Sequence, residues 1–124
     1  MRESLIATKS YAFALAILHL SEKLSKTTAN IVLIKQIIRS ATSIGANIEE
    51  AGGASSRRDF IHCMNISKKE ARETRYWLKL LRDTNTNFES ELEVLLNESE
   101  QIINILTRIV KTSIANQNKK SLTL

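Results

Sequence analysis

The amino-acid sequence predicts an all-α protein, folded as an antiparallel up-down-up-down four-helix bundle. Three observations carry this prediction. The 124 residues include no proline and only three glycines, so almost nothing in the chain forbids helix. Aromatic residues, at 5%, are few for a β-rich domain. Apolar residues recur at alternating spacings of three and four along four stretches, and the short connections between these stretches make neighbouring helices antiparallel.

The first predicted helix covers residues 4–25. Its inner face combines two series spaced by seven, which are Ile6, Phe13 and Leu20 with Ser10, Ile17 and Leu24. Residues 11–20 have the apolar character of a signal-peptide core, but they are too few to span a bilayer and no A-x-A pattern follows them. We therefore expect a buried first helix and no membrane association. Thr27, Thr28 and Asn30 then supply cap and turn chemistry.

The second predicted helix covers residues 30–51. The apolar positions on its expected inner face are Ile31, Ile34, Ile38, Ala41, Gly45 and Ile48. The pair Gly52-Gly53 should end this helix, because glycine takes the left-handed conformation past a helix end at little cost.

The third predicted helix covers residues 57–82. The stretch from Ser56 to Asp59 has the form of a capping box, with aspartate in place of the usual glutamate. Its expected inner face consists of Phe60, Met64, Ser67, Ala71, Thr74, Leu78 and Leu81.

The fourth predicted helix follows a break at residues 83–87, and Thr86-x-x-Glu89 has the form of a capping box for its start. Its expected inner face consists of Phe88, Leu92, Leu95, Ser99, Ile102, Leu106, Ile109 and Ser113. We assign residues 1–116 to a single domain. Residues 117–124 lack an apolar period and are predicted to form a flexible tail.

Two of the helices carry more apolar residues than one inner face needs. The additional residues, again spaced by seven, are Ile37, Ile44 and Ala51 in the second helix and Leu96, Ile103 and Val110 in the fourth. A wide apolar stripe is consistent with a broad core face or with a contact to another subunit, and the pattern alone does not decide between them.

Little in the sequence indicates an enzyme. No glycine-rich phosphate loop, zinc-binding spacing or nucleophile elbow occurs. His19 and His62 lie on different helices, and the set of glutamates that a helical di-iron site requires is absent. We expect neither a metal nor a cofactor. Cys63 is predicted to be a buried, unreactive thiol, which is consistent with a reducing cytoplasm.

A row of polar residues runs beside the apolar face of the second helix, and its members are Arg39, Ser43, Asn47 and Glu50. The row is either a solvated face or a packed polar contact. Lysine and glutamate usually dominate solvated faces, whereas this row carries serine, asparagine and arginine between apolar neighbours. In a packed contact, Arg39 or Asn47 would meet a carboxylate such as Glu73. Each member that is buried would need a partner, because an unsatisfied buried polar group costs about 1–3 kcal/mol.

Most of the formal net charge of +5 lies on the third helix, because residues 57–83 contain eight basic and four acidic residues. Five of these basic residues follow spacings of four, three, four and three, and they are Lys68, Arg72, Arg75, Lys79 and Arg82. Lys69 lies beside this stripe, and Arg58 lies nearer the start of the helix. This stripe is about 20 Å long, which matches the reach of several phosphates on one nucleic-acid strand. The alternative is a solvated face whose neighbours are Glu70, Glu73 and the acidic fourth helix.

Residues 39–51 (RSATSIGANIEEA) and 59–81 (DFIHCMNISKKEARETRYWLKLL) resemble a known family of four-helix-bundle proteins. The first recognised members of that family are encoded in intervening sequences inside bacterial large-subunit ribosomal RNA genes. The matching positions are Arg39, Ser43-Ile44, Asn47-Ile48-x-Glu50, Asp59-Phe60 and Glu73. Many members have glycine directly after the Asn-Ile-x-Glu motif, whereas this chain has Ala51 there. This difference bears only on the residue at which the second helix ends.

The resemblance implies a cytoplasmic bacterial protein that assembles as a ring, commonly a homopentamer, without a catalytic activity. A related bundle, the accessory variability protein of diversity-generating retroelements, is a basic pentamer that binds nucleic acid and a reverse transcriptase. By this analogy RNA or DNA is the expected partner of the basic third helix, and the polar row is expected to fix helix or subunit contacts. The alternative function is a structural or adaptor oligomer whose ligand is another protein.

Overall fold

A computed structural model describes the backbone of residues 2–123 and the side chains of residues 5–119. The all-α prediction is confirmed, because the described chain forms four α-helices and no strand. The elements are α1 (Arg2–Lys23), α2 (Thr28–Gly52), α3 (Arg57–Thr84), a short 3₁₀ helix η1 (Thr86–Phe88) and α4 (Glu89–Thr123). The first three helices begin and end within two residues of their predicted bounds.

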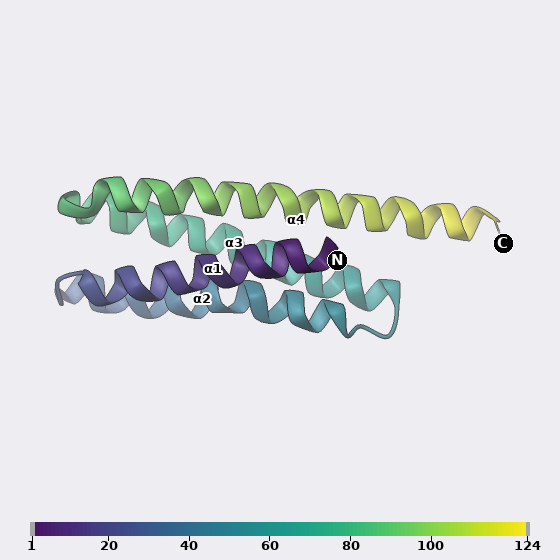
Figure 1. Ribbon diagram of the computed structural model, residues 1–124, viewed down its shortest axis with the longest axis horizontal. Coiled ribbons are helices and arrows are strands. Elements are labelled where there is room, and N and C mark those ends of the chain that lie inside the picture. The colour runs from purple at the N-terminus through teal and green to yellow at the C-terminus, as the bar shows by residue number, and fades with distance from the viewer. Residues whose placement is uncertain (1, 124) are drawn as a thin grey trace.

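The four helices lie side by side along one long axis, and the chain reverses direction at each connection (Figure 1). α2 packs against α3, α3 packs against α4, and α1 packs against both α2 and α4. The connections α1–α2 and α3–α4 therefore lie together at one end of the molecule, and the α2–α3 connection lies at the other end (Figure 1).

One hydrophobic cluster runs through the middle of this arrangement. The predicted inner faces of the first, third and fourth helices are confirmed. Every predicted position of the first is buried, and the half-buried exceptions in the other two are Phe60 of α3, Phe88 of η1 and Ile109 of α4. Cys63 is half-buried at the edge of this cluster, not fully buried as predicted, because it lies on the flank of α3 one position before the buried Met64.

The predicted inner face of α2 is partly wrong. Ile31 is 57% exposed, whereas Ile37 and Ile44, which were assigned to an additional stripe, are 1% and 0% exposed. The helix is rotated from the predicted orientation because it packs chiefly against α3. Ser67 of α3 donates a hydrogen bond to the backbone carbonyl of Ile44 (2.8 Å), and Thr74 of α3 donates one to the hydroxyl of Ser40 (2.8 Å).

The additional apolar stripes of α2 and α4 belong to the core of the single chain. Their members are Ile37, Ile44, Ala51, Leu96, Ile103 and Val110, and all of them are at most 7% exposed. Of the two explanations for these wide stripes, the broad core face is therefore correct, and these six residues give no support to a contact with another subunit.

The helix ends agree with some of the predicted cap chemistry and differ from the rest. Thr27 and Ser56 act as N-caps, accepting hydrogen bonds from the backbone N–H groups of Asn30 and Asp59, each at 3.1 Å. The left-handed conformation expected at the end of α2 is wrong, because Gly53 has φ −100° and its N–H instead bonds back to the carbonyl of Glu50 at 3.1 Å.

The capping box expected at the start of α4 is also wrong. The chain enters α4 through η1, and the residue before η1, Asn85, has its side chain turned to α2. Asn85 and the buried Asn30 exchange two hydrogen bonds, at 2.8 and 3.0 Å, and Asn30 also donates to the carbonyl of Ser25. This amide pair joins the two connections that lie at the same end of the molecule. Thr86 lies inside η1, so it does not take the non-helical N-cap position that the predicted capping box requires.

α4 continues as a helix through Thr123, so residues 117–123 are helical and extend past the other three helices (Figure 1). The predicted tail therefore has helical backbone, and its flexibility stays a prediction. Within the described residues, no helix combines the length and apolar content that crossing a membrane requires.

Candidate functional site

Two polar surfaces, one on α3 and one between α2 and α3, contain all but three of the candidate site residues. The first, here called the basic surface, consists of Arg58, Lys68, Lys69, Arg72, Arg75, Lys79 and Arg82. The second, here called the Arg39 cluster, lies between α2 and α3 and consists of Arg39, Glu70 and Glu73. The three remaining candidates, Ser43, Asn47 and Glu50, lie on α2.

Part of the basic surface is neutralised by α4. Arg75 forms an ion pair with Glu100 at 2.8 Å, and Arg82 forms one with Glu93 at 2.9 Å and another with Asp83 at 2.9 Å. The hydrogen bond from Arg82 lowers the pKa of Asp83 below its ordinary value. The sequence identified the acidic character of α4 but did not show which cations α4 would pair with.

The other cations of the basic surface remain available. Within the described part of the chain no ion pair is made by Arg58, Lys68, Lys69, Arg72 or Lys79. Lys69, Arg72 and Lys79 are exposed and lie at spacings of three and seven on one side of α3. The free positive charge is therefore concentrated on this exposed line, not on the whole predicted stripe.

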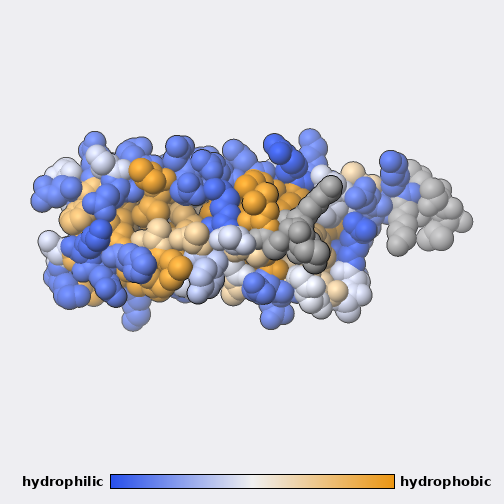
Figure 2. Space-filling model, in the orientation of Figure 1, coloured by the Kyte–Doolittle hydropathy of each residue, from blue (hydrophilic) through white to orange (hydrophobic). Residues whose placement is uncertain are grey.

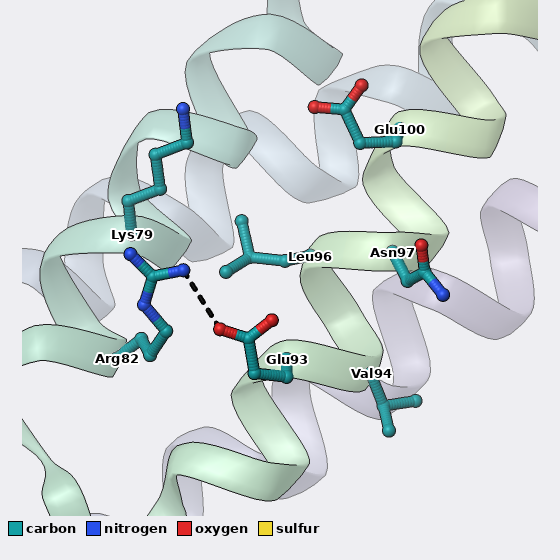
Figure 3. Close-up of a pocket in the computed structure, with 7 residues that line it drawn as sticks. All are labelled: Lys79, Arg82, Glu93, Val94, Leu96, Asn97 and Glu100. Carbon is teal, nitrogen blue, oxygen red and sulfur yellow. Dashed lines mark hydrogen bonds and ion pairs between the residues drawn. The ribbon is translucent and has the colours of Figure 1, made fainter.

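A surface hollow between α3 and α4 contains charges of both signs (Figure 3). Its lining residues are Lys79, Arg82, Glu93, Val94, Leu96, Asn97 and Glu100. In Figure 3 the Arg82 side chain reaches Glu93, while the ammonium group of Lys79 points away from that ion pair. Because two carboxylates oppose two cations, this hollow does not favour an anion, and Lys79 contributes its charge to the open side of α3.

The polar row of α2 divides into parts with different roles. Arg39 reaches across to α3, where it pairs with Glu70 at 3.3 Å and with Glu73. Of the two residues predicted to meet Glu73, Arg39 makes the contact, but its side chain is 50% exposed and the contact lies at the surface. Glu70, which was considered only as a neighbour of the basic stripe, is the more buried of the two carboxylates, and its Oε1 atom has no hydrogen-bond partner among the described residues.

The remaining members of the row do not reach α3. Asn47 donates to the backbone carbonyl of Ser43 at 2.8 Å, and the hydroxyl of Ser43 donates to the backbone carbonyl of Arg39 at 2.7 Å. Glu50 is exposed and has no ion pair within the described chain. Only Arg39 of the four therefore fixes one helix to another, because the other polar bonds stay within α2.

The described residues do not bring three histidine, cysteine, aspartate or glutamate side chains together as a metal ion would require. Over residues 2–123 the geometry thus defines an all-α arrangement of four α-helices, with an exposed cationic line on α3 and an arginine–glutamate cluster that joins α2 to α3.

The model of the 23S rRNA-intervening sequence protein family matches residues 2–108, and the chain belongs to this family. The chain is also similar to a solved structure, a protein of unknown function of the S23 ribosomal protein family from Bacteroides thetaiotaomicron VPI-5482. The two share 44% sequence identity with a TM-score of 0.81, and the alignment covers 90% of this chain and 99% of the other. No curated protein gives a significant match. Neither the family description nor this neighbour indicates an enzyme class.

Proposed function

We propose that this protein is a non-enzymatic four-helix bundle that binds RNA or DNA with low sequence specificity in the bacterial cytoplasm, as a ring of identical subunits, most simply a pentamer. The observation that carries the proposal is the exposed line of Lys69, Arg72 and Lys79, cations that form no ion pair with any described residue. These residues span about 15 Å of helix, a length that faces several phosphates of one strand. Phosphate contacts of this kind position a nucleic acid without reading its bases.

Assembly would multiply a weak interaction. A single subunit offers a few phosphate contacts, and several linked copies would raise the overall affinity through effective concentration. The surface that supports assembly is apolar and lies along α1, where Leu5 and Tyr11 are each 69% exposed and Leu15 is 39% exposed. Figure 2, in the orientation of Figure 1, shows hydrophobic atoms gathered along the middle of the molecule, between hydrophilic borders. Exposed apolar surface that is bordered by polar residues is typical of protein contacts.

The same apolar surface favours a second candidate function, a structural or adaptor oligomer that binds another protein. A hollow between α1 and α2 is lined by small and apolar residues, among them Ala7, Ala14, Leu15, Leu18 and Gly45. A partner that contributes an apolar helix would fit this chemistry better than a nucleic acid would.

The test is fluorescence anisotropy with a labelled single strand and a labelled duplex at low and at physiological salt. We expect binding to both probes that weakens steeply with salt. The double variant Arg72→Gln with Lys79→Gln should bind several-fold more weakly and should have a shallower salt slope. The matched control is Lys26→Gln with Arg108→Gln, which removes the same charge from two exposed cations that make no ion pair within the described chain.

Two outcomes would contradict the proposal. Wild-type protein that binds neither probe at low salt has no nucleic-acid function of this kind, and the adaptor function then becomes the better candidate. Equal weakening in the two double variants would mean that overall charge, and not the line on α3, attracts the probe.

A further inference from the structure

An aromatic ring interrupts the line of free cations on α3. Tyr76 is 57% exposed, and it lies four residues after Arg72 and three residues before Lys79. Residues at these spacings are neighbours on a helix surface. The ring is therefore flanked by one cation on the preceding turn and one on the following turn.

The Tyr76 ring rests against a second aromatic ring that is partly buried. Tyr76 and Trp77 meet edge to face, with ring centroids 5.2 Å apart and planes at 67°. Trp77 packs against the hydrophobic core, so it limits the movement of its neighbour. A ring that is held on one side and exposed on the other loses little conformational freedom when a flat ligand covers it.

The surroundings of Tyr76 differ from those of the other strongly exposed tyrosine. Tyr11 is 69% exposed, but it lines the hollow between α1 and α2 beside alanine and leucine side chains. Burial of Tyr11 therefore suits an apolar partner. Tyr76 has Arg72 and Lys79 beside it, neither of which has a carboxylate partner within the described residues, while the neighbouring carboxylate, Glu73, is paired with Arg39. The ligand that would cover Tyr76 therefore combines a flat face with negative charge.

We infer that Tyr76 is a base-stacking residue, and that the basic surface binds single-stranded RNA or DNA more tightly than duplex. This inference rests on the proposed nucleic-acid function and adds the class of nucleic acid to it. In an unpaired strand a base can leave its neighbours and stack on the ring while the adjoining phosphates contact Arg72 and Lys79. Stacking on a protein aromatic ring is sequence-tolerant, because every base has a π-face.

A duplex cannot use this ring in the same way. Its bases are paired and stacked along the axis, so the cations of α3 meet phosphates while Tyr76 meets no free base face. Loss of the ring should therefore weaken single-strand binding alone. From the measured range for base–aromatic stacking, the expected loss is about 5-fold to 150-fold for one base.

The experiment compares three labelled probes of one length by anisotropy at low salt: oligothymidine, an abasic strand that keeps the phosphates, and a duplex. Wild-type protein should bind oligothymidine more tightly than the other two. Tyr76→Leu should bind oligothymidine as weakly as wild type binds the abasic strand, with duplex binding unchanged. Tyr76→Phe should retain the preference, because its ring remains.

The matched control is Tyr11→Leu, which removes a tyrosine of α1 that is even more exposed than Tyr76 and should leave the ratio of single-strand to duplex affinity unchanged. A variant that changes assembly changes the affinity for all three probes by the same factor. The ratio of single-strand to duplex affinity therefore reports stacking alone. Two results would overturn the inference and leave the proposed function intact. In the first, binding depends on salt but Tyr76→Leu has the same ratio of single-strand to duplex affinity as wild type. In the second, wild type binds oligothymidine and the abasic strand equally. No binding to any probe would overturn both.

Discussion

Two carboxylates of α4 are expected to restrain nucleic-acid binding by the basic surface. Glu93 and Glu100 each hold an arginine of α3, Arg82 and Arg75, at 2.9 and 2.8 Å. The double variant Glu93→Gln with Glu100→Gln would free Arg75, would leave Arg82 with Asp83 as its one remaining carboxylate within the described chain, and would raise the formal net charge by two. It should therefore bind nucleic acid more tightly than wild type, although no residue that contacts the ligand has been changed.

The size of this effect follows from the number of cations released. The slope of log affinity against log salt changes by about 0.7 for each phosphate contact with a single strand, so two further contacts steepen it by up to about 1.4. Between about 50 and 200 mM salt, that steepening corresponds to roughly a sevenfold larger loss of affinity. The two lost ion pairs are partly exposed and contribute only about 0–1 kcal/mol each to folding, so the variant should remain folded.

The assay is a salt series of anisotropy titrations with a labelled single strand. The control variant is Glu22→Gln with Glu49→Gln, which makes the same change in net charge at exposed carboxylates of α1 and α2 that form no ion pair within the described chain. If the α4 variant and the control variant change affinity and slope equally, the ion pairs do not mask the basic surface and the reasoning is wrong.

Two further predictions concern stability and assembly. Asn30→Ala should lower the free energy of unfolding by about 2–3 kcal/mol, because it removes three buried or half-buried hydrogen bonds of about 1 kcal/mol each. Urea denaturation measures this, with the exposed Asn104→Ala as control, and equal effects of the two substitutions would contradict it. Light scattering should give a mass several times 14.0 kDa, most simply fivefold, and Leu15→Glu should reduce it by placing a charge on the apolar surface of α1. A monodisperse single chain in the wild-type protein would refute assembly.

Much of the fold could be read from the sequence because each helix carries its own signals. In and directly after α1, the residues from Ile6 to Leu24 that are spaced by seven are all buried, as a helical period requires. The caps at Thr27 and Ser56 are equally local, since a side-chain oxygen needs only the backbone N–H group three residues later. The run of basic residues on α3 is also a property of one helix and needed no neighbour to be recognised.

The tertiary structure decided every feature that depends on two helices at once. α2 has two overlapping apolar stripes, and its sequence does not show which of them faces the core. In the folded chain α2 is turned so that Ile44 is buried and Ile31 is exposed, and in this orientation Ser67 and Thr74 of α3 form hydrogen bonds with α2. Which cations of α3 remain free depends on the register of α4, because a carboxylate neutralises an arginine only within a few ångströms. A sequence records how often apolar and charged residues recur along one helix, whereas the rotation and register of its neighbour follow from packing all the side chains together.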